Sequence, residues 1–161
     1  MNQGRGIKLA GAAGLFVVLV TLISGGAATA CCCCSPGTGT PGYWMNHPEA
    51  WPVDAIYIGG ELYTREEAIE FMKAPTAGDK TYTLFQALVA AELNIAIGNC
   101  SCCIDSIVYQ AHVWMESYPL GSNVRGSSCA WDCGEYLYCW LDAYNNGELC
   151  APSRDECEAD D

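Results

Sequence analysis

Positive charge is scarce in this sequence. Lysine and arginine together number 7, against 19 aspartate and glutamate residues, and the formal net charge is −12. Residues 1–30 hold Arg5 and Lys8 and no acid, so the remaining 131 residues carry 5 bases and 19 acids, a charge of −14. Such a surface repels phosphate groups, which excludes direct nucleic-acid binding. It also excludes docking on anionic lipid through a basic face.

Recognisable catalytic patterns are missing as well. There are only 2 histidines, no G-x-S-x-G nucleophile elbow, no D-x-D-x-D-G calcium loop and no C-x-x-C-H haem signature. The many carboxylates are scattered, whereas a glycoside hydrolase needs two at a defined separation in a cleft. We therefore predict no catalytic activity and no cofactor, and keep a secreted hydrolase only as the third of three hypotheses.

Only one stretch is long and apolar, and it lies at the N-terminus. Two bases precede an uncharged run over residues 9–23, and small residues up to Ala28-Thr29-Ala30 follow. This order is typical of a secretory signal peptide with an A-x-A cleavage site. The apolar core of about 15 residues is short against the roughly 20 of a membrane anchor. We predict that residues 1–30 are removed, so that the mature protein is secreted or on the cell surface. Lipidation of Cys31 is the alternative, and only then would a membrane hold it.

Cysteine, by contrast, is abundant, and all 12 cysteines lie after residue 30. That density in an exported chain indicates a disulfide scaffold formed in an oxidising compartment, with essentially no free thiol. Neighbouring cysteines bridge each other only through a strained ring, so we expect residues 31–34 to bond to distant partners. The sequence leaves the pairing open. The disulfide candidates are Cys31, Cys32, Cys33, Cys34, Cys100, Cys102, Cys103, Cys129, Cys133, Cys139, Cys150 and Cys157.

The pattern of apolar residues predicts a mainly α fold. Residues 56–58 and 61–63 flank Gly59-Gly60, which predicts a small β-hairpin. A capping box at Thr64 and Glu67 begins a helix that Pro75 ends. Apolar periodicity predicts three further helices, over about 80–97, 103–117 and 130–144. Residues 31–161 are thus expected to form a single compact, disulfide-rich domain of about four helices.

Two details of this prediction concern side-chain placement. Asp79 or Thr81 is expected to cap the helix that begins near residue 80. In the last helix, the inward residues are expected to be Leu137, Trp140, Leu141 and Tyr144. The stretch after Gly147 is expected to be irregular and held by cysteines.

One segment carries a resemblance. Pro41 to Pro52 reads PGYWMNHPEAWP, and it combines two tryptophans with a histidine at an unusual spacing. It resembles the GYWKNHPEAWP signature of an uncharacterised domain of bacterial secreted and surface proteins, and the similarity continues to about Tyr118. Met45 stands where lysine is usual. The resemblance implies an extracellular or cell-surface setting and no particular reaction.

The same segment can be interpreted from its residues. With two tryptophans and two prolines in Tyr43 to Pro52, we expect it to be packed but irregular. Trp44 and Trp51 would anchor it on the helices, and His47 would satisfy a local backbone group. Together with Tyr43 these residues form the expected structural or recognition segment.

Thioether and imidazole groups lie close together at two places. Met45 and His47 are two residues apart, and His112 and Met115 are three apart, on one face of a predicted helix. These ligand types suit copper, so an extracytoplasmic copper-binding protein is our second hypothesis. Core packing of Met115 and backbone hydrogen bonding by His47 explain the same residues without a metal, so we predict no metal site.

Aromatic residues remain once these patterns are assigned. The chain has 5 tryptophans and 9 tyrosines, concentrated in residues 43–63 and 131–144. These side chains combine apolar area with a polar tip, as recognition surfaces require. The first hypothesis is therefore a secreted or cell-surface structural or interaction module, acting in adhesion or assembly. Its partners would be other envelope or extracellular components, including further copies of itself.

Overall fold

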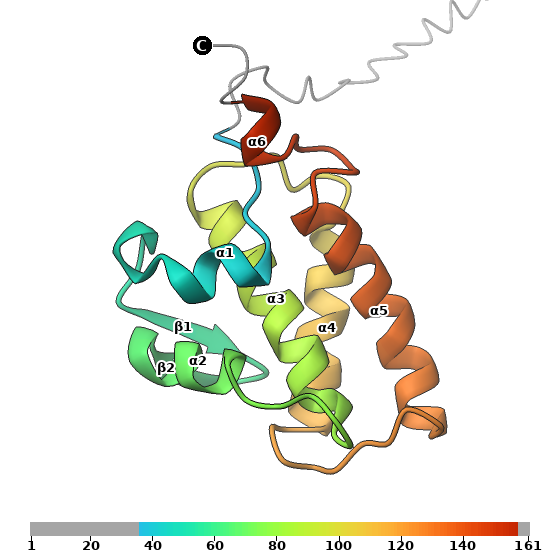
Figure 1. The fold of residues 1–161 in the computed structure, drawn as a ribbon. Helices are drawn as coiled ribbons and strands as arrows, with labels where there is room; N and C mark the ends of the chain where they lie inside the picture. The colour runs from blue at the N-terminus through green and yellow to red at the C-terminus, as the bar shows by residue number, and fades with distance from the viewer. Residues whose placement is uncertain (1–35, 158–161) are drawn as a thin grey trace, which may run out of the picture.

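The computed structural model describes residues 36–157, and the mainly α class with a small hairpin is confirmed. Three long helices form its centre: α3 (Lys80–Ala96), α4 (Asp105–Ser117) and α5 (Cys129–Asn145). They run alternately up, down and up, as Figure 1 shows. We call the end that holds residues 97–104 and 146–157 the apex, and the end that holds residues 118–128 the base. The expected signal peptide and Cys31–Cys34 lie outside the described residues.

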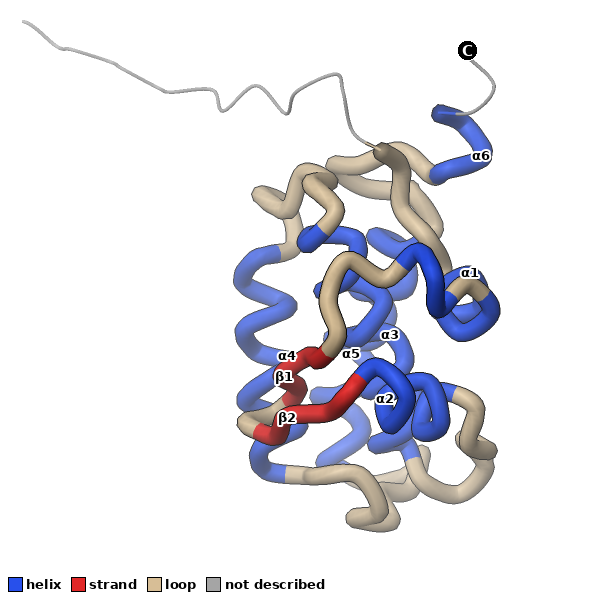
Figure 2. Tube along the Cα trace, turned by 90° about the vertical axis from the view of Figure 1, so that its left-hand side faces the viewer, coloured by secondary structure: helices blue, strands red, loops and turns tan. Residues whose placement is uncertain are grey.

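The predicted hairpin packs beside this bundle (Figure 2). Strands β1 (Ala55–Ile58) and β2 (Glu61–Thr64) pair antiparallel, with Ile58 opposite Glu61. The turn residue Gly59 has a φ of 58°, and a Cβ there would lie 2.6 Å from the Cβ of Met115. Glycine is therefore required for the turn to lie directly on α4.

Helix α2 (Arg65–Met72) follows β2 and begins with the predicted capping box. The Thr64 side chain accepts from the Glu67 backbone N–H, and the Glu67 carboxylate accepts from the Thr64 backbone N–H at 2.9 Å. Two N–H groups that a helix start leaves without partners are satisfied in this way. The cap fixes the direction in which the chain leaves the hairpin.

Asp79 rather than Thr81 caps α3, and it also closes the base. Its Oδ1 accepts from the backbone N–H of Thr81 at 3.0 Å. The backbone N–H groups of Asn123 and Val124 donate to the same carboxylate at 2.9 and 3.2 Å. One carboxylate thus joins the start of α3 to the loop that leads into α5.

The segment expected to be irregular is largely helical, so that prediction was wrong. It forms α1 (Pro41–Asn46) and a 3-10 turn, η1 (Pro48–Ala50). Proline at the first helical position costs no hydrogen bond, and the Thr40 side chain accepts from the backbone N–H of Tyr43. Pro41 and Pro48 stand at the starts of α1 and η1, so these prolines begin helical turns instead of preventing them.

One of the four residues predicted on the inner face of α5 lies on its outer side. Leu137, Leu141 and Tyr144 are buried as expected, but Trp140 is 38% exposed. Trp131 and Gly134 occupy the inner stripe instead. Trp140 precedes Leu141 by one residue, a rotation of about 100° on a helix, which turns it away from the core.

Both ends of the described chain meet at the apex. Thr38 and Ser153 form an isolated parallel bridge, with the Thr38 N–H donating to the Pro152 carbonyl at 2.8 Å. The short helix α6 (Arg154–Cys157) follows, in a stretch that was expected to be irregular. A disulfide joins Cys103 to Cys150 and links the loop before α4 to the loop after α5.

Candidate functional site

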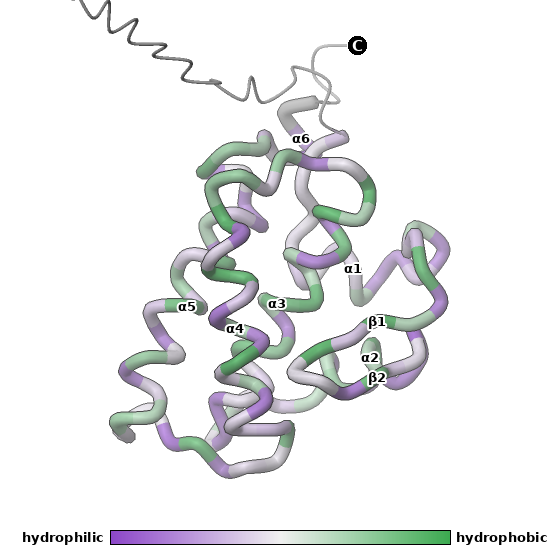
Figure 3. The backbone as a smooth tube through the Cα atoms, turned by 180° about the vertical axis from the view of Figure 1, so that it is seen from behind, coloured by the Kyte–Doolittle hydropathy of each residue, from purple (hydrophilic) through white to green (hydrophobic). Residues whose placement is uncertain are grey.

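In the described part of the chain, an apolar depression lies between α4 and α5. The two helices lie side by side in Figure 3, which views the molecule from behind. We call this depression of about 640 Å³ the α4–α5 groove. It is lined by Tyr109, Gln110, Val113, Trp114, Ser117 and Tyr118 from the α4 side and by Asp132, Cys133, Tyr136 and Leu137 from α5.

Close packing of the two helices makes the floor of the groove. Trp114 is 7% exposed, and its indole N–H donates to the Ala130 carbonyl at 3.0 Å. A Cβ on Gly134 would lie 2.9 Å from a ring atom of Trp131 and 3.0 Å from ring atoms of Trp114. Glycine at this position therefore allows both indoles to lie between the helices.

The walls of the groove expose apolar side chains to solvent. Tyr109 is 70% exposed, Tyr136 56% and Val113 44%. Trp140 lies beyond Tyr136, with the two ring centroids 6.4 Å apart. Four large exposed apolar side chains thus lie on one helix pair, and three more, Val53, Tyr57 and Leu62, lie on or beside the hairpin. Such a group on neighbouring helices is typical of an interaction surface.

Charge on these two helices is of one sign. Helices α4 and α5 together carry five carboxylates and neither lysine nor arginine. Asp132 lies on the groove wall itself. The two helices of the groove therefore carry only acidic charge, while the Lys80 ammonium from α3 lies 5.2 Å from the centroid of the Trp131 ring.

The predicted segment around the two tryptophans lies elsewhere, on the α1 side, and its tryptophans are inside the fold. Trp44 is 0% exposed and Trp51 6%, and the Trp51 indole N–H donates to the Trp44 carbonyl at 2.9 Å. His47 does not bond a backbone group as expected. Its Nδ1 lies 2.9 Å from the Glu49 carboxylate, and its ring stacks on Tyr43 at 4.6 Å. The tryptophans thus serve packing, whereas His47 is on the surface.

A buried amide that the sequence analysis missed holds this segment in place. The Oδ1 of Asn94 accepts from the Gly39 N–H at 2.7 Å and from the Trp44 indole N–H at 3.1 Å. Its Nδ2 donates to the Gly39 carbonyl and to the Oδ1 of Asn145, both at 2.9 Å. Asn145 in turn donates to the Ala87 carbonyl. The available signal was an asparagine inside an otherwise apolar helical run.

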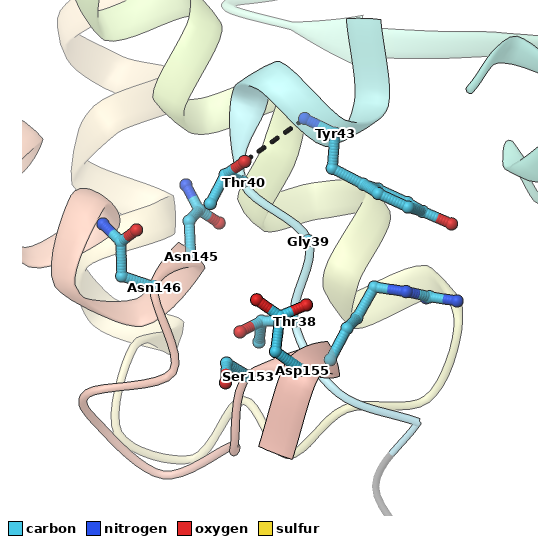
Figure 4. Close-up of a pocket in the computed structure, with 9 residues that line it drawn as sticks. Thr38, Gly39, Thr40, Tyr43, Asn145, Asn146, Ser153 and Asp155 are labelled. Atoms are coloured by element: carbon cyan, nitrogen blue, oxygen red, sulfur yellow. Dashed lines mark hydrogen bonds between the residues drawn. The ribbon is translucent and has the colours of Figure 1, made fainter. Parts of the chain in front are cut away.

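A second, polar pocket of about 390 Å³ opens where the N-terminal segment, α5 and α6 meet (Figure 4). Thr40, Asn146, Ser153 and Asp155 are among its lining residues, and Tyr43 forms one side. Sugar-binding sites also combine an aromatic ring with amides and a carboxylate. The Tyr43 ring, however, already contacts the Arg154 guanidinium, 4.6 Å from its centroid, and the His47 ring. We therefore interpret this pocket as a structural junction.

His112, the α4 histidine of the copper hypothesis, is hydrogen-bonded within the fold through both ring nitrogens. The Gly59 N–H donates to His112 Nδ1 at 3.2 Å, so Nδ1 carries no proton. Nε2 must then carry it and donates to the Glu92 carboxylate at 2.7 Å. With both ring nitrogens engaged and Met115 2% exposed, this pair offers no copper ligand. The two hydrogen bonds of His112 instead hold the hairpin turn at Gly59 against α3 and α4.

Cysteines cluster at the apex. The Sγ atoms of Cys100 and Cys102 lie 3.3 Å apart, and both lie within 4.8 Å of the Cys150 Sγ. Within residues 36–157, this is the set of three or more histidine, cysteine or acidic side chains close enough to share a metal ion. Because Cys150 is bonded to Cys103, it has no thiolate to offer. The cluster is therefore a disulfide site in this structure.

Tyr144 is a core residue that lies near this cysteine cluster. Its side chain is 0% exposed, and its hydroxyl has no hydrogen-bond partner within the described part of the chain. Burial raises the pKa of Tyr144 far above its ordinary value, and the neighbouring Cys100 and Asp105 raise it further. The phenol stays protonated and acts as a core residue.

Three cysteines do not form the bridges that were expected of all twelve. Cys129, Cys133 and Cys139 are free, exposed thiols on α5. They are exposed and form no bridge in the described part of the chain, which differs from the expected absence of free thiols. Cys133 belongs to the wall of the α4–α5 groove, and Cys139 does not. The side chain of Cys157 lies outside what the structure describes.

Comparison of the chain with protein-family models, with curated proteins and with solved structures finds no match. The resemblance of Pro41–Pro52 to a secreted and surface domain therefore stays a prediction. In residues 36–157, no helix has both the length and the apolar character needed to cross a membrane. The candidate site thus depends on the geometry of the α4–α5 groove alone.

Proposed function

We propose that this protein is a secreted or cell-surface interaction module that binds another component of the cell exterior through the α4–α5 groove. The observation that carries the proposal is the groove itself, where Tyr109, Val113 and Tyr136 expose apolar surface above a buried indole floor. Tyrosine and tryptophan are enriched where binding energy is concentrated. No catalytic step is part of the proposal.

The rest of the fold supports a passive binding role. The two histidines are engaged by Glu49 and Glu92, and the buried amides Asn94 and Asn145 hydrogen-bond each other. Such groups stabilise a fixed scaffold rather than presenting reactive atoms. Rigid helices that carry the binding residues lower the entropic cost of association.

The test is crosslinking in the cells that produce the protein. A photoreactive phenylalanine analogue would replace Tyr109 in the groove or, as a matched control, Tyr57 on the hairpin, which is 63% exposed. We expect irradiation to attach the Tyr109 variant to a defined cell-exterior component and to leave the Tyr57 variant unattached. Equal crosslinking at both positions, or none at Tyr109, would contradict the proposal.

A further inference from the structure

The groove lies where a fourth helix could pack, and its length matches about two helical turns. Helices α3, α4 and α5 form an antiparallel three-helix arrangement, and the outer side of the α4–α5 pair is uncovered by the described chain (Figure 3). A fourth helix laid there would complete a four-helix bundle. From Tyr109 to Ser117 the wall rises about 12 Å, which is roughly two helical turns. A partner helix would therefore place apolar side chains at i, i+4 and i+7 in it.

The charge of the groove selects among such helices. Asp105 lies one turn before Tyr109 on α4, and Asp132 lies one turn before Tyr136 on α5, so each apolar wall continues into a carboxylate. Neither helix offers a basic residue in return. A second copy of this chain would bring like charges face to face, whereas lysine and arginine on the partner would pair with these carboxylates.

We propose that the occupant of the α4–α5 groove is a cationic amphipathic helix of another protein. Its apolar face packs between Tyr109, Val113 and Tyr136, and its basic residues flank that face and meet Asp105 and Asp132. The inference rests on the proposed function and names the chemistry of the partner. Charge steers the encounter, and the apolar contacts determine the lifetime of the complex.

The experiment uses a synthetic probe, since the partner is unidentified. A labelled peptide of about 18 residues, with leucine on one helical face and lysine on the other, is titrated with the protein while its fluorescence anisotropy is followed. The control peptide has glutamate in place of every lysine. We expect the lysine peptide to bind, more weakly as salt is raised, and the glutamate peptide not to bind.

Variants locate the binding. Tyr136→Ala should weaken binding about tenfold, because it removes a wall of the groove, whereas the equally exposed Tyr57→Ala should change it less than about twofold. Asp132→Lys should weaken binding and reduce its dependence on salt. All three changes are at exposed positions, and circular dichroism confirms that the fold is kept.

Protection of a thiol gives a second readout in the unmodified protein. Cys133 lies on the groove wall and Cys139 does not, and both are exposed. Bound peptide should slow alkylation of Cys133 and leave the rate at Cys139 unchanged. Slowing at both residues, or at neither, would overturn the assignment of the groove.

The outcomes separate this inference from the proposed function. Tight binding of the glutamate peptide, lost in Tyr136→Ala, would overturn the cationic partner while the groove remained a docking site. No binding of either peptide would overturn the inference, and the crosslinking result at Tyr109 would stand independently. Self-association in sedimentation, abolished by Tyr136→Ala, would replace the cationic helix with a second copy.

Discussion

The amide of Asn94 offers the sharpest test of what holds the N-terminal segment to the bundle. Two donors reach its Oδ1, the Gly39 N–H at 2.7 Å and the Trp44 indole N–H at 3.1 Å, and neither group can accept. Two acceptors receive its Nδ2, the Gly39 carbonyl and the Asn145 Oδ1. The orientation of the amide is therefore fixed by its neighbours, and all four of its hydrogen bonds are made.

The cost of removing this group follows from the partners left behind. Asn94→Ala strands four buried polar groups, and at about 1 kcal/mol each, the low end for an unsatisfied group, unfolding becomes easier by about 4 kcal/mol. Asn94→Asp keeps both accepted bonds but turns a carboxylate oxygen toward two acceptors in a buried site. We expect a loss of about 3 kcal/mol or more at neutral pH.

The aspartate variant also predicts a direction with pH. Burial and the facing acceptors raise the pKa of the introduced carboxyl in the folded state above its unfolded value. A raised folded pKa means that the folded state binds the proton more tightly, so the deficit is greatest at neutral pH and shrinks as the pH falls. Protonation restores one donor toward the Gly39 carbonyl or the Asn145 side chain.

Urea unfolding followed by circular dichroism at pH 7 and pH 4.5, relative to wild type, measures both effects. Asn146→Asp is the matched control, because Asn146 is exposed and the charge change is the same. It loses one exposed hydrogen bond, from its Nδ2 to the Asp142 carbonyl at the C-terminus of α5, so it should cost no more than about 1 kcal/mol. If Asn94→Asp were equally harmless, or if its deficit did not shrink in acid, the buried network would not be what secures the segment.

Four further changes test other parts of the fold by the same unfolding assay. Trp44→Ala should cost roughly 3–5 kcal/mol, and unchanged stability with lost partner binding would instead make its segment a recognition surface. Replacing Cys103 and Cys150 by serine opens a loop with a sequence separation of 47 and should cost about 4 kcal/mol, a loss that reductant should mimic in wild type. Burial alone would raise the pKa of Asp79, but hydrogen bonds from Thr81 and the base loop outweigh it and lower the pKa. Asp79→Asn should therefore cost roughly 1–3 kcal/mol at neutral pH, with a deficit that shrinks as the pH falls through the ordinary range of aspartate. Gly134→Ala should destabilise by about 1–3 kcal/mol despite the better helix propensity of alanine, and a gain in stability would show that the two indoles can move apart.

Local signals were sufficient for the elements of this fold. The hairpin at Gly59-Gly60, the capping box at Thr64 and the helix over about residues 103–117 each depend on residues close together in sequence, and the structure confirms them. The helix over Pro41–Asn46 was missed because prolines in and near this segment were interpreted as signs of an irregular chain, whereas Pro41 is the first helical residue. The residues around Pro41 were therefore sufficient to predict this helix start as well.

The relation between elements could not be predicted in the same way. The bonds of Asn94 to Gly39 and Asn145 span more than fifty residues, and no local pattern marks such a pair. The α4–α5 groove depends on how closely the two helices approach each other. Gly134 permits this close approach, but a glycine in a helical stretch does not by itself predict it. Trp140 was placed inward because it is large and apolar, whereas the position of the inner stripe turned it to the surface.

The apex has a mechanical consequence. The segments around Thr38 and Ser153 run parallel, so tension applied between residues 36 and 157 shears their hydrogen bonds together instead of opening them one at a time. Beyond that point, the bond between Cys103 and Cys150 carries the load past α4 and α5, and roughly 160 Å of chain stays hidden from the pulling force. The groove lies wholly within this covalent loop. We therefore expect the chain that forms the groove to be shielded from direct stretching for as long as the disulfide is intact.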